Sequence, residues 1–460
     1  MFDESGRTAK VDLQSSEMHS SGSWPLEILA DFFHHFAAMT NPSKSLGKSS
    51  GWRIEDRFFT EDRLTWYGAG VVVVYAVHFA LLLCNGHWLV SADGGFKKND
   101  FSYIWVSGNL AASSDPGRIF DNAAFSAAQL ALAAPDDGSP FIPYFVYPPT
   151  FLMFTYPLGL MPYLTAFTVW MVATLFLYQA AVCAIIARPV AVILVLTPLS
   201  VVFNLELGQN GFLTAGLIGL TLAFTECRPW LSGIFLGLLS YKPQFGILFP
   251  FALLASRNWR ALVSATATSV ALGATAAIAF GGQGWLAFIY SLVGPRNEGL
   301  GEIPGWQPPL VSIFAFLQSA GAGAHISWAV QLAAATIVAV MVCAIWAKPV
   351  PHSLKAAALC IGSVLVTPYV LGYDLCVLSI AVAFFVKDAL SRGFLPGERA
   401  VILMCWAGLI LLIAPLIPII ICVVLLLLAA RRIAAYRKLR PHRRAPAAAE
   451  SCGDLRNQLS

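Results

Sequence analysis

Five polar clusters interrupt the hydrophobic parts of this chain, and each carries side chains that could do chemistry. They are Asn99-Asp100-Phe101 with Tyr103, Tyr144 with Tyr147-Pro148-Pro149, Asn204 with Gly208-Gln209-Asn210, Tyr241-Lys242-Pro243-Gln244, and Thr367-Pro368-Tyr369 with Tyr373-Asp374. The carboxylate of Asp100 could act as a general base, since such a group can remove a hydroxyl proton in a transfer reaction. The ammonium of Lys242 could neutralise an anion. Each cluster alone is a weak signal.

Each cluster also has a purely structural interpretation. The polar segment 97–121 could be a solvated loop, Tyr147 and the prolines after it could form an interfacial anchor and a helix start, and residues 208–210 could be a turn. Lys242 is harder to explain in this way. It stands in a long apolar stretch, where an ammonium needs an anion or a carbonyl cage. The sequence therefore favours a functional role for Lys242.

The residues after Asp100 predict a helix. Phe101, Ile104 and Trp105 recur at helical spacing within residues 100–112. This pattern suits a helix lying on a bilayer surface with Asp100 near its start. One carboxylate would then lie at the boundary between water and lipid.

The composition is that of a membrane protein. Hydrophobic residues make up 57% of the 460 residues, charged residues 12%, and the mean hydropathy is +0.69. Apolar runs long enough to cross a hydrocarbon core of about 30 Å recur between residues 65 and 430. We therefore expect an all-α polytopic membrane protein with about 11 hydrophobic helices. Two further runs, 150–162 and 310–320, are too short to span and could be re-entrant.

The charges and the metal-binding residue types exclude other classes. A net charge of +4, spread over the flanks of the hydrophobic runs, gives no indication of nucleic acid as a partner. The cysteines form no Cys-x-x-Cys pair, and the adjacent histidines His34 and His35 have no second pair at ligand spacing. A metal site is not supported.

The chain divides into three regions. Residues 1–64 are expected to be a cytoplasmic, partly disordered region with a possible in-plane helix at 25–39. Residues 65–430 form the membrane domain, and residues 431–460 a basic cytoplasmic tail. Basic residues flank both ends of the membrane domain, whereas residues 91–146 carry six acids against three bases. The positive-inside rule therefore places both termini in the cytoplasm and the loops 92–146 and 281–309 outside.

With this topology, every polar cluster falls on the same outward face as Asp100. Polar groups at membrane depth are costly unless they face protein or a water-filled cavity. A shared outward cavity is the economical explanation.

Taken in order, the clusters resemble glycosyltransferase family 87, membrane enzymes of the C-type glycosyltransferase superfamily that take sugar from a polyprenyl-phosphate donor. The resemblance covers roughly residues 65–430. It rests on the Asp-Phe-x-Tyr segment at Asp100, a Gly-containing turn ending in Asp121, Tyr147-Pro148-Pro149, Gly208-Gln209-Asn210 and Lys242-Pro243-Gln244.

The resemblance implies a C-type glycosyltransferase-like bundle of about 11–13 hydrophobic helices, with amphipathic interfacial helices in the early outward loop. It also implies transfer of a hexose, mannose above all, from polyprenyl phosphate to a lipid or glycan acceptor, with inversion and without a cofactor, nucleotide or required metal. The enzyme would contact membrane lipids in a bacterial inner membrane. Its active site would face the periplasm or the cell exterior.

The resemblance also implies roles for individual residues. Asp100 matches the acid that follows the first span in such enzymes and is the candidate catalytic base. Lys242 is the best-placed cation for the donor phosphate, with Arg118 and Arg296 as further candidates. The candidate substrate-binding residues are Tyr103, Trp105, Tyr147, Gln209, Asn210, Gln244, Tyr369 and Asp374.

The chain departs from the family pattern in two places. Some members carry a histidine in the outward break before the last spans, where this chain has Tyr369, Tyr373 and Asp374. Asp374 could substitute near the phosphate or assist the base. The loop containing Arg296 cannot be matched residue by residue, which leaves the acceptor open.

Two other functions remain as alternatives. Polar breaks within membrane helices also mark transporters and flippases of lipid-linked or polar solutes, although these usually contain paired repeats and no second copy of the Asp100 or Lys242 segment is found. Polymerases or ligases of surface polysaccharide share the substrates but normally carry a large outward loop late in the chain. Here the largest outward loop is early.

Overall fold

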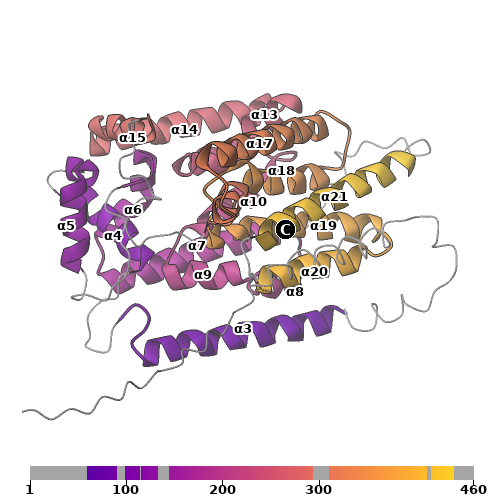
Figure 1. Cartoon of the computed structure of the whole chain (residues 1–460), viewed down its shortest axis with the longest axis horizontal. Coiled ribbons are helices and arrows are strands. Elements are labelled where there is room, and N and C mark those ends of the chain that lie inside the picture. The colour runs from indigo at the N-terminus through magenta and orange to yellow at the C-terminus, as the bar shows by residue number, and fades with distance from the viewer. Residues whose placement is uncertain are drawn as a thin grey trace, which may run out of the picture. The chain divides into compact units, whose positions relative to one another are not determined.

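The computed structural model describes residues 60–90, 99–113, 116–132, 145–293, 310–411 and 416–439. All of them belong to one compact unit, residues 53–460. In these residues every extended regular element is a helix (Figure 1), and the β-pairing consists of two isolated bridges, Trp88–Val90 and Leu310–Leu371. The predicted all-α fold is confirmed. The helix predicted at 25–39 lies outside the described residues.

The helices follow one another along the chain as α3 (Glu61–Cys84), α4 (Asp100–Ala111), η2 (Pro116–Phe120), α5 (Asn122–Leu132), η3 (Pro149–Phe151), α6 (Leu152–Gly159), α7 (Tyr163–Ile185), α8 (Pro189–Leu194), α9 (Leu199–Leu207), α10 (Gly211–Phe224), α11 (Pro229–Leu238), η4 (Leu239–Tyr241), α12 (Pro243–Gly246), α13 (Phe249–Ala255), α14 (Trp259–Phe280), α15 (Gln283–Val293), α16 (Ile313–Ser319), α17 (Ala324–Trp346), α18 (His352–Val366), η5 (Gly372–Leu375), α19 (Cys376–Arg392), α20 (Glu398–Leu411) and α21 (Leu416–Leu439). The elements labelled η are 3₁₀-helices.

Five helices in the described part of the chain are long and apolar enough to cross a membrane. They are α3, α7, α14, α17 and α21. Shorter apolar helices cover Gly211–Phe224, Pro229–Tyr241, Pro243–Ala255 and His352–Val366. The protein is therefore an integral membrane protein.

The polar clusters coincide with breaks between helices. Gly208 ends α9 in the left-handed conformation, with φ +69°. Lys242 separates η4 from α12, and Pro243 is the first residue of α12, where a proline fits without losing a hydrogen bond. The apolar segments on either side of each cluster thus form separate, short helices. The short run 150–162 contains the end of η3 and the eight-residue α6, and the run 310–320 contains the seven-residue α16.

Glycines allow α11 and α14 to pack closely. A Cβ added at Gly233 or Gly237 would lie 2.4 Å from the side chain of Ser264 or Thr268, respectively. The neighbouring pair α7 and α10 packs in the same way, because a Cβ at Gly219 would lie 2.8 Å from Ala181. Small residues are the usual means of close helix contact in membranes, where apolar burial alone does not drive association.

The helix predicted at residues 100–112 is present as α4, and it begins at Asp100. It does not simply lie on a surface, since eight of its 12 residues are buried. Its backbone touches that of α6: a Cβ on Gly108 would lie 2.0 Å from the carbonyl oxygen of Thr155, and one on Gly159 would lie 2.0 Å from Gly108. This contact fixes the helix that carries Asp100.

The first membrane helix, α3, contacts α8 through Gly68, whose added Cβ would lie 2.8 Å from Ile193 (Figure 1). The hydroxyl of Tyr75 donates to the carbonyl oxygen of Thr197 at 2.7 Å. At the start of α3, Glu61 pairs with Arg188. These contacts attach α3 to the segment before α9.

A buried charge cluster joins the last three helices. Arg432 of α21 pairs with Asp388 of α19 and Glu398 of α20, and it donates to the carbonyl oxygen of Gly393 at 2.8 Å. Each of the three ionic side chains is at most 4% exposed. Charges buried this deeply are tolerated because they are paired.

Candidate active site

Asp100 is the first residue of α4, and its side chain is half-buried. The side-chain amide of Gln209 donates to Asp100 Oδ2 at 2.8 Å. Among the described residues, Gln209 is the one side chain that donates to this carboxylate, which leaves Oδ1 able to accept a proton. Burial raises the pKa of Asp100 above its usual range, and the hydrogen bond from Gln209 acts in the opposite direction.

Asn99 fixes the backbone just before Asp100. The hydroxyl of Tyr163, the first residue of α7, donates to Asn99 Oδ1 at 2.8 Å. The amide of Asn99 in turn donates to the carbonyl oxygen of Glu206 at 3.4 Å. The start of α4 is therefore attached to both α7 and α9.

The turn after α9 holds Gln209 in place. Asn204 accepts twice, with its carbonyl from Gln209 N at 3.1 Å and with its side chain from Gly211 N at 2.7 Å. A Cβ at Gly208 would lie 2.5 Å from the Cβ of Phe101, the neighbour of Asp100. The glycine is thus required both by its positive φ and by the approach of α4.

Lys242 is buried beside an acid. Its side chain is 3% exposed, and its ammonium donates to Asp374 Oδ1 at 2.5 Å and to Asn210 Oδ1 at 2.8 Å. It also lies 5.0 Å from the ring centre of Tyr373. The anion and the carbonyl that the sequence requires around this ammonium are both present.

Asp374 is held by the loop around it. Its second oxygen, Oδ2, accepts from the backbone amide of Leu371 at 3.2 Å. That loop pairs with the segment before α16, since Val311 N donates to the carbonyl oxygen of Val370 at 2.8 Å. The position of the acid is therefore set by backbone contacts.

Asn210 connects the cation to Tyr147. While Asn210 Oδ1 accepts from Lys242, its Nδ2 donates to the hydroxyl of Tyr147 at 2.7 Å. Because Gln209 is its sequence neighbour, one turn contacts Asp100 on one side and the Lys242 pair on the other. The structure thus joins one residue or more from each of the five polar clusters in a single network, here called the Asp100–Lys242 network: Asp100, Tyr147, Gln209, Asn210, Lys242 and Asp374.

Comparison with known proteins gives one match. The family model of glycosyltransferase family 87 matches residues 145–371, which include Tyr147, the 208–210 turn and Lys242. The chain belongs to glycosyltransferase family 87. No curated protein and no solved structure was found to be similar to it.

The protein is thus a membrane glycosyltransferase that needs a sugar donor and an acceptor. Asp100 and Asp374 lie outside the segment that the family model matches. Their connection to it comes from the hydrogen bonds of Gln209 and Lys242. Among the described residues of this glycosyltransferase, no three histidine, cysteine, aspartate or glutamate side chains are grouped to hold a metal ion.

Four other predicted substrate residues lie outside the Asp100–Lys242 network. The hydroxyl of Tyr103 accepts from Val146 N at 2.5 Å, and Trp105 donates to the carbonyl oxygen of Met161 at 2.9 Å. Tyr369 packs near Trp328, with ring centres 6.4 Å apart. The half-buried side chain of Gln244 makes no hydrogen bond to a residue that the structure describes.

The two predicted arginines are placed differently. Arg118 is exposed on η2, which packs against α4, α5 and α15, and it takes no part in the Asp100–Lys242 network. Arg296 lies outside the described residues.

Three tyrosines around the glycosyltransferase network had no role predicted from the sequence. Tyr163 orients Asn99, Tyr241 shares a 2.6 Å hydrogen bond with Thr214, and Tyr373 faces Lys242. Tyr241 and Tyr373 are direct neighbours of Lys242 and Asp374, which is a usable signal. Tyr163 has no comparable sequence signal, apart from its position at the start of an apolar run.

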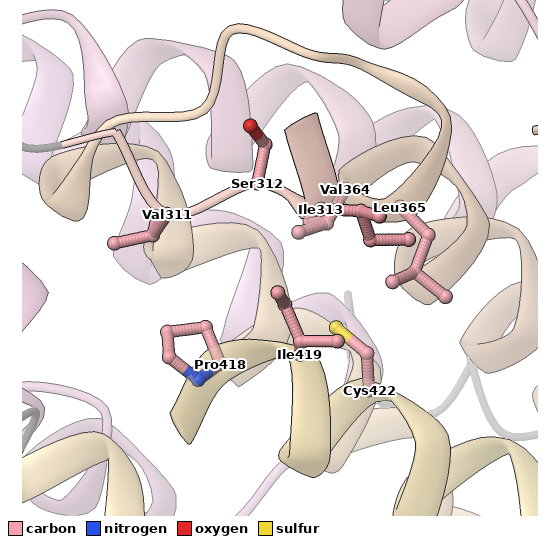
Figure 2. Close-up of a pocket in the computed structure, with 8 residues that line it drawn as sticks. All are labelled: Val311, Ser312, Ile313, Val364, Leu365, Pro418, Ile419 and Cys422. Carbon is pink, nitrogen blue, oxygen red and sulfur yellow. The ribbon is translucent and has the colours of Figure 1, made fainter. Parts of the chain in front are cut away.

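A small pocket adjoins the loop that carries Asp374. Figure 2 shows it between the segment before α16 and the start of α21, with Val364 and Leu365 of α18 beside them. The hydroxyl of Ser312, on its wall, caps α16 by accepting from Ala315 N at 3.1 Å. The pocket is therefore apolar in character and contains no member of the Asp100–Lys242 network.

Removing the Gln209 donor should change the pH dependence of the glycosyltransferase. Gln209→Met preserves much of the side-chain volume but loses the hydrogen bond that lowers the pKa of Asp100. A base works only when deprotonated, so the acid limb of the rate profile should move to higher pH, and part of the lost rate should return there. The charged and titratable groups facing Asp100 are Tyr163 of α7, Tyr147 before η3 and Tyr373 of η5.

The measurement is the transfer rate against pH. Gln179→Met is the matched control, since Gln179 donates to Val192 O at 3.2 Å away from the network. A uniform loss of rate with an unmoved acid limb would show that Gln209 serves packing alone.

Proposed function

We propose that this glycosyltransferase moves a hexose, with mannose as the expected sugar, from a polyprenyl-phosphate donor to a lipid or glycan acceptor. The observation that carries the proposal is the carboxylate of Asp100, which Gln209 fixes through one oxygen while the other can accept. A positioned carboxylate of raised pKa is suited to general base catalysis.

The proposed reaction is a direct displacement. Asp100 accepts the proton of an acceptor hydroxyl as that oxygen forms a bond to the anomeric carbon of the donor sugar. The bond from this carbon to the phosphate oxygen breaks, and polyprenyl phosphate leaves with the electron pair. The anomeric centre inverts, so a β-linked donor gives an α-linked product.

Positive charge is needed near the leaving phosphate. Lys242 is the proposed source, and Arg118 and Arg296 could add to it from the outward loops. The aromatic side chains of Tyr103, Trp105 and Tyr369 are proposed to contact sugar or prenyl groups, together with the amide of Gln244. Asp374 has a different proposed task, which is to keep Lys242 charged and in place.

The proposed location is a bacterial inner membrane with the network facing the periplasm or the cell exterior. Single cysteines at positions 100 and 118, in a cysteine-free background, should react with an impermeant thiol reagent added outside intact cells. A cysteine at position 437, at the exposed end of α21, should react only after lysis. Reaction of positions 100 and 437 from the same side would contradict the proposed topology.

The decisive experiment is a transfer assay with purified protein. It uses radiolabelled polyprenyl-phosphate mannose, a total lipid extract of the native host and other polyprenyl-phosphate sugars in parallel. A labelled product made only with active protein would support the proposal and identify the acceptor. No product from any of these donors would contradict it and would favour transport of lipid-linked solutes.

A further inference from the structure

The hydrogen bonds between Lys242 and Tyr147 have a fixed direction. An ammonium can only donate, so the oxygen of the Asn210 side chain must face Lys242, as observed at 2.8 Å. The Asn210 nitrogen, which can only donate, then faces the Tyr147 hydroxyl at 2.7 Å. Tyr147 therefore accepts from Asn210. The hydroxyl of Tyr373 also hydrogen-bonds with Tyr147 and, like Asn210, lowers its pKa, as a donor does. The proton of Tyr147 can then point to a third group.

Tyr147 is the accessible end of this chain of hydrogen bonds. Asn210 is fully buried and Lys242 is 3% exposed, whereas Tyr147 is half-buried. The ammonium of Lys242 has three N–H donors, of which two bond to Asp374 and Asn210, and burial shields the third. Tyr147 is thus the most exposed of these three residues.

The surroundings keep the tyrosine ring in place and its hydroxyl protonated. The ring lies 4.2 Å from that of Phe151 and 6.1 Å from that of Tyr103, centre to centre. Burial, followed by the negative charges of Asp374 and Asp100, raises the pKa of Tyr147 above its usual range. The phenol is thus a hydrogen-bond donor at physiological pH, close to the proposed base.

We propose that Tyr147 donates its hydroxyl proton in a hydrogen bond to a phosphate oxygen of the lipid-linked donor, and that Lys242 acts on this phosphate through Asn210 and Tyr147. The assignment rests on the proposed function only in taking a prenyl-linked phosphate as the ligand. It makes Tyr147 a contact of the leaving group, and it makes Lys242 and Asn210 positioning residues.

Binding of undecaprenyl phosphate, the expected product, tests this assignment without requiring transfer. Affinity is measured by calorimetry for detergent-purified wild type, Tyr147→Phe and the control Tyr75→Phe, whose hydroxyl bonds Thr197 elsewhere. We expect Tyr147→Phe to bind on the order of 10-fold to 100-fold more weakly, as for loss of a hydrogen bond to a charged group, and Tyr75→Phe to bind normally. Equal affinity of wild type and Tyr147→Phe would overturn the assignment.

Two further ligands distinguish the source of the phosphate. Inorganic phosphate and phosphatidic acid are titrated into the same proteins. An affinity for either that depends on Tyr147 as strongly as that for undecaprenyl phosphate would overturn the restriction to a prenyl-linked donor. Dependence confined to undecaprenyl phosphate is the expected result.

A change of hydrogen-bond direction supplies a second test. In Asn210→Asp both side-chain oxygens accept, so Tyr147 would have to turn its proton toward residue 210 and away from the ligand. We expect Asn210→Asp to bind undecaprenyl phosphate as weakly as Tyr147→Phe, and the double variant to be no weaker than either. Additive losses would mean that the two residues act separately, and would overturn the assignment.

The transfer assay separates this assignment from the proposed function. Wild type that binds undecaprenyl phosphate through Tyr147 but transfers no sugar would leave the phosphate site standing and remove the proposed function. If the wild type transfers sugar and Tyr147→Phe has the same donor kinetics, the proposed function would stand and the phosphate contact of Tyr147 would be removed.

Discussion

Replacement of Asp100 by asparagine is expected to lower the rate of sugar transfer by at least about 100-fold, the lower end of what a general base contributes. The amide has nearly the shape of the carboxylate, so its oxygen can still accept from Gln209. It cannot accept the proton of an acceptor hydroxyl at neutral pH. The loss should therefore fall on the rate of transfer, with the protein inserted in the membrane and folded.

The measurement compares the initial transfer rates of the two proteins at saturating donor. Asp121→Asn is the matched control from the same early loop, because Asp121 caps α5 by accepting from Ala123 N at 2.9 Å and Ala124 N at 3.1 Å, and asparagine can do the same. Near-normal turnover by Asp100→Asn would remove this residue from the role of base.

The second large effect concerns Lys242 and is seen first in stability. Lys242→Met would leave the carboxylate of Asp374, which is 1% exposed, without its counter-charge. Loss of one partner from a buried ion pair costs about 3–5 kcal/mol, because the other charge remains buried. Thermal unfolding in detergent should show a clear drop relative to wild type. Lys355→Met is a suitable control, since that half-buried lysine donates to the carbonyl oxygen of Trp346.

A double variant separates stability from function. Lys242→Met with Asp374→Leu removes both charges, and an apolar pair of similar volume should recover much of the lost stability. Use of the sugar donor should remain impaired, because the positive charge behind Asn210 and Tyr147 is absent. If the double variant recovered both stability and donor use, Lys242 would have a structural role alone.

The fold could be predicted well from the sequence because it depends on long-range averages of hydrophobicity. The all-α membrane class and the helix that begins at Asp100 are both confirmed. The polar clusters indicated where the apolar runs are interrupted, but not how short the helices between them are. The exact helix ends depend on the backbone conformation at these clusters, such as the left-handed conformation of Gly208 and the start of α12 at Pro243.

The composition of the site could be predicted in part. A buried lysine must have an anion or a carbonyl cage, and the anion expected from the sequence was the donor phosphate. Only the fold shows that Asp374 contacts Lys242. The task of Gln209 was also beyond the sequence. An amide can bind sugar or orient an acid equally well, and the choice depends on a contact between residues 109 positions apart.

The charge cluster of Arg432 has a consequence for biogenesis. Asp388 and Glu398 precede Arg432 by 44 and 34 residues, so the ribosome delivers both carboxylates to the membrane well before their counter-charge. Until α21 arrives, Asp388 has only Arg392 of its own helix α19 as a partner at 3.1 Å, and Glu398 lacks the arginine with which it pairs in the finished protein. A chain that stops short of residue 432 would lack the arginine that joins these two carboxylates, which provides the membrane quality-control proteases with a chemical difference between a finished enzyme and an incomplete one.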